Sequence, residues 1–202
     1  MPLIHRVRQT LGKRWYAIMP TDKLIALIGD QNHSGNTEML INALKERLAH
    51  QDGSLDHLDW SSTTLTGALL SSCRLKHARF SAAQLRGAYF GYSNVCSADF
   101  TGADLRRANL REARMTNAIF DRANLQEANF ARAILRDCAF VAADLSQANL
   151  WGADLRGANL TEASMVNCNV SNVIVDQSTT MPSGEAYSED IRWGEFTRAS
   201  RY

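Results

Sequence analysis

The residues that most suggest chemistry lie in a glycine-containing loop near the amino terminus. Residues 23–29 (KLIALIG) are typical of a strand, and residues 30–37 (DQNHSGNT) lead into a predicted helix. In nucleotide-binding proteins this order of elements carries the phosphate-binding motif G-x-x-x-x-G-K-[ST]. Here five residues separate Gly29 from Gly35, and Asn36 stands where the motif has its lysine. No βαβ unit follows, so we interpret the segment as a loop and a helix capped by Asn36 or the next threonine.

Cysteine and histidine show no spacing that is typical of a metal or redox site. Neither a C-x-x-C pair nor a combined Cys/His metal pattern occurs. We interpret Cys96 as outward-facing, which makes it the one candidate reactive thiol, and we expect three cysteines at inward positions: Cys73, Cys138 and Cys168. Four histidines are interpreted as ordinary polar surface residues: His33, His50, His57 and His77. We therefore expect no metal ion, no cofactor and four reduced structural thiols.

A repeat of five residues determines how the rest of the chain is arranged. Every position divisible by five is apolar from Leu65 to Val175, and from Ala68 to Cys168 the residue two places before it is Ala, Cys or Ser. Positions five apart step around an α-helix by about 140°, and an odd period would put successive apolar residues on opposite faces of a flat strand. The chain must therefore bend every five residues, with both positions facing inward.

Longer spacings indicate four sides in each coil. Aromatic residues recur at the apolar position every twenty residues, at Trp60, Phe80, Phe100, Phe120 and Phe140. Asparagine recurs with the same spacing one place earlier in the repeat, at Asn109, Asn129, Asn149 and Asn169. Four sides would stack each set in a column, as identical side chains stack in other β architectures, with coils about 4.8 Å apart.

These repeats resemble one known family. The units that carry the likeness are ADLRR at 103–107, ANLRE at 108–112, ANLQE at 123–127, ADLRG at 153–157 and ANLTE at 158–162. Over about residues 55–177 the chain is similar to the pentapeptide repeat family. The resemblance implies an all-β solenoid, a right-handed quadrilateral parallel β-helix with Leu or Phe at the centre of each side. It implies no shared activity, because the family includes gyrase-protecting DNA mimics and differentiation regulators.

The chain is predicted to contain four segments. They are a basic amino-terminal arm (1–22), a small helical cap (23–53), the β-helix (54–177) and a short carboxy-terminal cap or tail (178–202). Caps are expected because a solenoid otherwise exposes its core and an unpaired edge at each end. After Val175 the pattern fails, and Thr180 is predicted to occupy an apolar centre. The tail either caps its own coil, which we favour, or exchanges with a second copy in a dimer, which the family resemblance also allows.

Composition narrows the class of partner. The 202 residues carry a net charge of +1, which favours neither a polyanion mimic nor a strong nucleic-acid binder. No apolar run approaches the roughly 20 residues of a membrane span, and we expect a cytoplasmic protein. Residues 3–18 have apolar positions at near-helical spacing between basic ones, so they could contact a membrane surface or an anionic partner. We favour packing of this segment on its own protein.

The outer sides of the coil supply the candidate binding residues. One side is predicted to present Tyr92 and Trp151 as aromatic anchors for a protein partner. A second side presents an apolar contact patch at Ile119 and Val141, and Trp193 in the tail is a further candidate contact. A basic stripe is predicted along a third side, from Arg74, Lys76, Arg114, Arg136 and Arg156.

The favoured function is a rigid, non-enzymatic interaction module or scaffold that binds a protein. No nucleophile–base pair, carboxylate dyad or oriented histidine can be identified in the sequence, and the predicted surface is convex. We therefore do not expect this protein to be an enzyme. One alternative is a DNA mimic that protects gyrase or another topoisomerase; the neutral-to-basic sides disfavour it, because mimicry needs negative charge at phosphate-like spacing. The other is binding of nucleic acid or an anionic membrane through the basic stripe and the arm.

Overall fold

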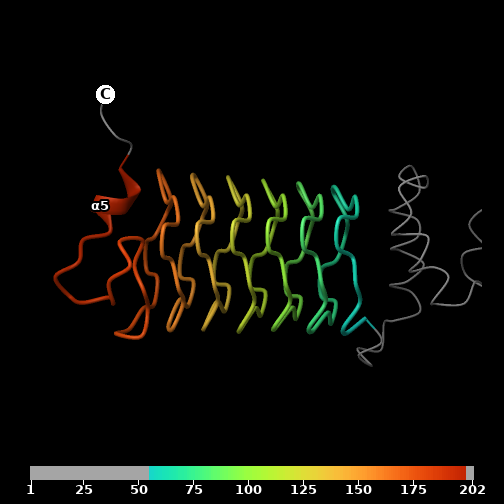
Figure 1. The fold of residues 1–202 in the computed structure, drawn as a ribbon, viewed down its shortest axis with the longest axis horizontal. Helices are drawn as coiled ribbons and strands as arrows, with labels where there is room; N and C mark the ends of the chain where they lie inside the picture. Colours follow the sequence, from blue (N-terminus) through green and yellow to red (C-terminus); the bar gives the residue numbers. More distant parts are fainter. Residues whose placement is uncertain (1–54, 199–202) are drawn as a thin grey trace, which may run out of the picture.

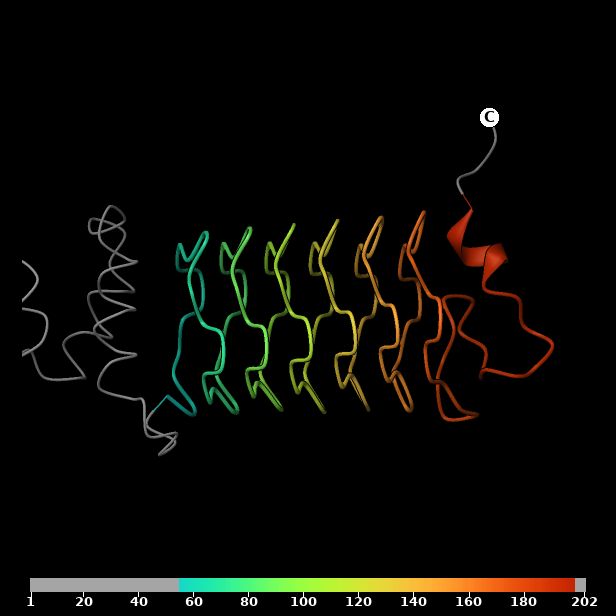
Figure 2. The same cartoon turned by 180° about the vertical axis from the view of Figure 1, so that it is seen from behind.

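A computed structural model describes residues 55–198 of the chain. The predicted basic arm (1–22) and helical cap (23–53) lie outside these residues. Successive coils lie side by side in a row along the long axis (Figure 1), and the view from behind shows the same row (Figure 2). The α-helix of the described part is α5, Gly194–Thr197, beyond the last coil.

Parallel β-bridges between residues twenty apart join each coil to the next. The first turn is made by the bridges Asp59↔Arg79, Thr64↔Gln84, Leu69↔Tyr89 and Arg74↔Asn94, so each coil has four sides. Each side contributes one bridged residue before the chain turns, and within residues 55–198 the pairing consists of isolated bridges. The quadrilateral coil agrees with the expected β-solenoid, although regular strand is scarce because five residues are too few for a longer ladder.

Backbone hydrogen bonds run along the rod between the coils. The amide of Leu65, at the centre of its side, donates to the carbonyl of Gln84 (2.7 Å), and the amide of Gln84 donates back to Thr63 (2.8 Å). At the following corner the amide of Gly67 donates to Arg86 (2.9 Å). Repeated on every side, this pattern gives most amides of the coils a partner in a neighbouring coil, which a narrow apolar rod requires.

The corners explain the polar positions of the repeat. The second residue after each centre has positive φ, from His57 (64°) through to Asn172 (59°), because the chain must turn sharply there. The residue before the centre is often Asp or Asn, whose Oδ1 accepts the amide of the first corner residue. Asn149 accepts from Trp151 (3.1 Å) and Asp99 from Thr101 (2.9 Å) in this way. The carboxylate or amide thus closes the corner as in an Asx-turn.

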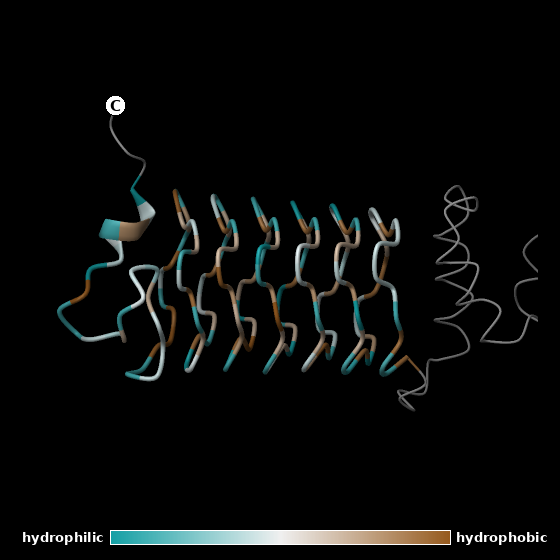
Figure 3. Ribbon diagram, in the orientation of Figure 1, coloured by the Kyte–Doolittle hydropathy of each residue, from teal (hydrophilic) through white to brown (hydrophobic). Residues whose placement is uncertain are grey.

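Aromatic rings form the predicted column inside the rod. The rings of Phe80, Phe100, Phe120 and Phe140 stack nearly parallel with centroids 4.8, 5.0 and 5.0 Å apart, close to the usual spacing of β-strands. Phe130 from the opposite side meets Phe120 edge-on at 5.9 Å and 90°. These rings are fully buried, and hydrophobic and hydrophilic residues alternate along every coil (Figure 3). The predicted Phe column is confirmed.

One inserted residue shifts the register at the end of the repeats. The bridge from Asn159 reaches Thr180, where a strict spacing of twenty would select Thr179. Thr179 instead takes the inward small position, where it is fully buried and its hydroxyl donates to the carbonyl of Leu155 (3.1 Å). Met181, also fully buried, is the apolar centre. The prediction that Thr180 occupies the centre is wrong, because an extra turn residue moves the whole unit by one place.

The chain after the last coil folds back onto it. Thr180 pairs antiparallel with Ala186, and the amide of Met181 donates to Glu185 (2.7 Å). Farther on, the amide of Asn167 in the last coil donates to the carbonyl of Thr197 in α5 (2.8 Å). This part of the tail therefore supplies an acceptor to an amide at the end of the solenoid that has no further coil to pair with.

Replacing Phe120 by Ala is expected to lower the free energy of unfolding by about 3–5 kcal/mol, because the ring packs against two stacked neighbours and one perpendicular ring in a closed core. Urea denaturation followed by circular dichroism measures the change. The adjacent Ile119, which is 39% exposed, serves as the control, and Ile119→Ala should cost about 1 kcal/mol or less. A loss below about 1 kcal/mol for Phe120→Ala would contradict the stacked core.

Glycine is expected to have opposite effects at two nearby alanines. Ala142 has φ 55°, so Ala142→Gly should remove left-handed strain of about 1–2 kcal/mol and give a net gain of up to about 1 kcal/mol after the entropy cost of glycine. Ala139 is a bridge residue between Ile119 and Asn159, and Ala139→Gly should cost about 0.5–1 kcal/mol. Thermal and urea unfolding of both variants test this; a loss at position 142 as large as that at 139 would contradict it.

Candidate protein-contact surface

The sequence-predicted anchors Tyr92 and Trp151 lie on the same side of the coil, three turns apart, with two arginines between them. We call Tyr92, Arg111, Arg132 and Trp151 the aromatic–arginine ridge. Each of the four occupies one of the two corner positions that follow the centres Phe90, Leu110, Phe130 and Leu150. Because the corners of successive coils lie one above another, the repeat aligns these side chains along the rod.

Trp151 and Arg132 form the best-defined contact of the ridge. The guanidinium carbon of Arg132 lies 4.8 Å from the centroid of the Trp151 ring, a cation–π geometry. Two hydrogen bonds from backbone amides hold the pair: the amide of Arg132 donates to the carbonyl of Trp151 (2.8 Å), and the amide of Trp151 donates to the side-chain Oδ1 of Asn149 (3.1 Å). Gly152 lies next to the aliphatic part of the Arg132 side chain: a Cβ atom at position 152 would lie 3.6 Å from Cγ of Arg132. The indole is left half-buried, with the guanidinium against it.

The other end of the ridge is more exposed. The Tyr92 side chain is 62% exposed and Tyr89, in the same repeat unit, is 46% exposed. Arg111 pairs with Glu112 at 3.0 Å. The pKa of Arg111 is raised, first by its hydrogen bond to Glu112 and further by the neighbouring Tyr92. The ridge therefore combines exposed aromatic surface with arginines held in place by neighbouring groups.

An asparagine ladder stiffens the same side. Asn149 donates from Nδ2 to Oδ1 of Asn129 (3.3 Å), and Asn169 donates in the same way to Asn149 (3.0 Å). Each acceptor oxygen also receives the amide of its own corner, such as that of Trp151 on Asn149. The predicted stacking of asparagines is confirmed, and it supports the backbone under the ridge.

The apolar patch on another side is small. Ile119 is 39% exposed and Val141 is half-buried. Ile119 bridges Asp99, and the amide of Val141 donates to a carboxylate oxygen of Asp121 (2.9 Å). Two carboxylates therefore border the pair, which limits the continuous apolar area available to a partner.

The structure places Trp193 apart from the other predicted contacts. It lies in the tail immediately before α5, half-buried, and packs against the hydrophobic core. Its indole ring is therefore used at least partly within the chain.

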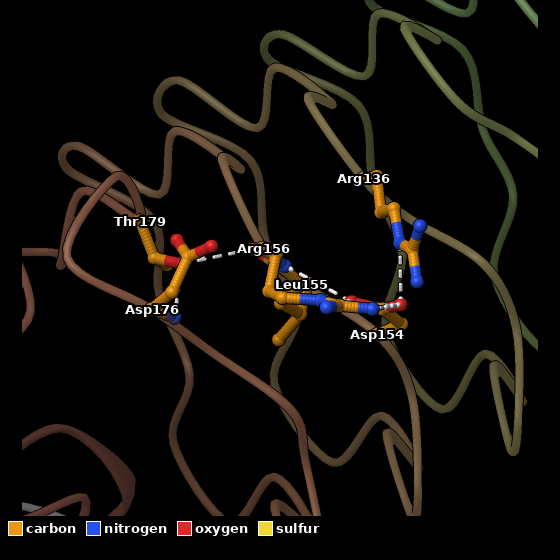
Figure 4. A network of polar contacts seen from close by, with 6 residues as sticks. All are labelled: Arg136, Asp154, Leu155, Arg156, Asp176 and Thr179. Atoms are coloured by element: carbon orange, nitrogen blue, oxygen red, sulfur yellow. Dashed lines mark hydrogen bonds and ion pairs between the residues drawn. The ribbon is translucent and has the colours of Figure 1, made fainter.

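Acidic partners neutralise much of the predicted basic stripe. Arg74 pairs with Asp56 (2.8 Å). Asp154 lies between Arg136 (2.6 Å) and Arg156 (2.8 Å), as Figure 4 shows. Within residues 55–198, the remaining members Lys76 and Arg114 form no ion pair. A shallow hollow beside this network is lined by groups of both signs: Arg136, Asp137, Arg156, Asp176 and Ser178. The stripe is less basic than its arginines alone indicate.

Sequence reasoning missed one pair of interacting side chains. The rings of His57 and His77 stack with centroids 4.7 Å apart and planes 5° apart. The available signal was their separation of twenty residues, which equals one turn of the coil. No group of three or more His, Cys, Asp or Glu side chains in the described part of the chain could hold a metal ion.

The comparison with protein families agrees with the repeat. The family described as pentapeptide repeats (8 copies) matches residues 63–102, 98–137 and 138–177. This chain belongs to the pentapeptide repeat family. Proteins of this family fold as right-handed quadrilateral β-helices, and the coil described above likewise has four sides.

Several solved pentapeptide repeat structures are similar to this chain. A protein from the Arabidopsis thaliana thylakoid lumen is 25% identical, with 57% of this chain and 67% of that chain covered and a TM-score of 0.45. Rfr23 from the cyanobacterium Cyanothece 51142 is 31% identical, with coverage of 54% and 63% and a TM-score of 0.21. QnrB1, a plasmid-mediated fluoroquinolone resistance protein, is 20% identical, with coverage of 60% and 81% and a TM-score of 0.33.

No curated protein matches the sequence of this pentapeptide repeat protein significantly. Among the described residues, no helix is long and apolar enough to cross a membrane.

Asp154 is expected to make the stability of this pentapeptide repeat protein depend on acid pH. Hydrogen bonds from Arg156 and then Arg136 lower the pKa of Asp154 from 3.8 to about 2, and its side chain is only 11% exposed. Because the folded-state pKa is the lower one, this stabilisation is complete above about pH 4 and is lost as the pH falls through about 2. Its size is about 2 kcal/mol.

The variant Asp154→Asn should therefore lack this part of the acid dependence. Urea unfolding of both proteins at several pH values between about 4 and 2 measures it. The stability difference between wild type and variant should shrink as the pH falls. A constant difference over this range would contradict the assignment.

Proposed function

We propose that this pentapeptide repeat protein is a non-enzymatic, rigid interaction module that binds a protein partner through the aromatic–arginine ridge. The observation that supports this most directly is Arg132 held 4.8 Å over the half-buried ring of Trp151. Family membership supports the general class of interaction module, since these proteins are generally structural or interaction modules.

The residue types of the ridge favour a protein as the partner. Trp, Tyr and Arg are the residues that most often dominate binding energy at protein interfaces. Tyr92 offers most of its ring to solvent, whereas Trp151 is braced by Arg132, so little side-chain entropy would be lost when a partner covers the indole. Hydrogen bonds between coils hold the backbone beneath both residues, which makes the ridge a preorganised surface.

The partner should present an apolar contact for the indole beside acceptor groups for the guanidinium of Arg132. Arg132 has no carboxylate partner among the described residues, in contrast to Arg111, which is paired with Glu112. A carboxylate or a row of backbone carbonyls on the partner could therefore accept its N–H groups. The small patch at Ile119 and Val141 lies on a different side and is a secondary contact in this proposal.

Charge distribution disfavours the two alternative functions. A DNA mimic needs a continuous row of unpaired acidic groups, yet Asp104, Glu127 and Asp154 are all paired with arginine. Binding of an anionic surface would draw on the basic stripe, which Asp56 and Asp154 partly neutralise. The contribution of residues 1–22 to such binding remains a prediction.

We further propose a monomer in the cytoplasm. The tail contacts the last coil of its own chain through Met181 and Thr197, which favours capping within the chain over exchange between two copies. Buried thiols such as Cys138, whose pKa is raised by burial, are suited to a reducing compartment.

The proposal predicts that a salt-resistant protein partner is lost when Trp151 is replaced. The full chain with an affinity tag is used for capture from its native extract at low and high salt, together with Trp151→Ala and Arg132→Ala. Once the partner is purified, Trp151→Ala should weaken its binding by at least about tenfold, which corresponds to 1.4 kcal/mol.

Ile134→Ala is the matched control, because Ile134 is an exposed apolar residue (36%) on another side of the coil. It should leave capture unchanged. Equal capture by Trp151→Ala and wild type would contradict the ridge as the binding surface. Recovery of gyrase subunits would instead favour the DNA-mimic function, and recovery of salt-sensitive nucleic acid or lipid alone would favour the basic surfaces.

A further inference from the structure

His57 and His77 form an exposed pair near the first described coil. Their rings lie 4.7 Å apart and almost parallel, and both side chains are exposed to solvent. Neither is used by the ridge, which lies on another side of the coil.

The backbone imposes this pairing. Both residues occupy the sharp second position of a corner, with φ of 64° and 58°, so their Cα–Cβ bonds leave equivalent points of adjacent coils. The amide of His57 donates to Lys76 (2.8 Å) and that of His77 to Cys96 (3.0 Å), which fixes the separation of the coils at these corners. The two imidazoles therefore start from adjacent points of the backbone, within reach of one another.

We propose that this pair binds a divalent transition-metal ion through one nitrogen from each imidazole. Imidazole is a favoured ligand of Cu²⁺, Ni²⁺ and Zn²⁺. Two metal–nitrogen bonds of about 2.0–2.1 Å limit the separation of the ligating nitrogens to about 4.2 Å. The nitrogen lone pairs lie in the ring planes, which are almost parallel in the stacked pair, so both rings must rotate about their side-chain bonds to converge on one ion. The exposure of both side chains permits this rotation.

The surroundings leave the site with two protein ligands. The nearby carboxylate of Asp56 already accepts from Arg74 and from the amide of Lys76, both at 2.8 Å. No cluster of three ligands exists in residues 55–198, so water or an external ligand completes the coordination. With so few ligands the affinity order should follow the intrinsic one, with Cu²⁺ bound most tightly.

Metal titration of the tag-free full chain tests the site. Cu²⁺ and Ni²⁺ are titrated by isothermal calorimetry at neutral pH into wild type, His57→Ala and His77→Ala. Each substitution should weaken binding by about tenfold or more, because the second imidazole acts at high effective concentration. His33→Ala and His50→Ala are the controls for histidines elsewhere in the chain, and they should bind as wild type does.

A spectroscopic measurement distinguishes chelation by the pair from binding at separate histidines. The electron paramagnetic resonance spectrum of the Cu²⁺ complex should show two coupled imidazole nitrogens in wild type and one in either single variant. Unchanged affinity in both His57→Ala and His77→Ala, or loss of binding with His33→Ala or His50→Ala instead, would overturn the proposal.

Adding a histidine to the same column provides an independent test. Ser97 is the next residue in the same column of corners and also has positive φ (57°). Ser97→His should place a third imidazole beside His77, which adds a second His–His pair and tightens Ni²⁺ binding by about twofold. The control Asn172→His introduces a histidine at the same type of corner (φ 59°) far along the rod and should not tighten it. Equal effects of the two substitutions would overturn the assignment to this column.

Discussion

The architecture depends on hydrogen bonding between coils that each turn every five residues. A side of the coil has room for one bridged residue, so its amide and carbonyl groups must find partners in the coils before and after it. The corner then needs a residue with a left-handed backbone conformation, of positive φ. The second residue after each centre adopts it, whether or not that residue is glycine. The stacked aromatic core follows from this constraint, because equivalent positions can only lie one above another. The surface features follow in the same way: the ridge, the asparagine ladder and the histidine pair are all columns of a single register.

Much of this arrangement could be predicted from the sequence. Period five excludes helix and flat strand, and the aromatic spacing of twenty gives four sides, as the stacked rings of Phe100 and Phe120 confirm. The register near the end of the repeats was not predicted, since a polar residue at position 180 signals that the strict period fails but not where the extra residue lies. The structure reveals the shifted register through the bridge from Asn159 to Thr180, the hydroxyl bond of Thr179 to Leu155 and the burial of Met181.

The candidate surface was predicted less completely, and the reason is physical. A repeat tells which residues share a side, so Tyr92, Trp151 and the basic residues could be grouped from spacing alone. The repeat does not show which partner each long side chain selects. Asp154 binds two arginines at once, and Arg132 turns onto Trp151 while Arg111 takes a carboxylate. Such choices depend on competition between neighbours a few ångströms apart, which a pattern of five residues does not encode.

The inserted residue before Thr179 also shows how such a rod can change length during evolution. Adding or removing twenty residues within the repeats would return every side chain to its own column, so whole coils are interchangeable units. Adding one residue moves each later position to the neighbouring role, and the bridged residue Thr180 is followed directly by an antiparallel turn back to Ala186. A slip of a single residue thus coincides with the point at which winding stops. In a protein of this kind, the length of the solenoid can vary by whole coils, and an insertion of one residue can terminate it.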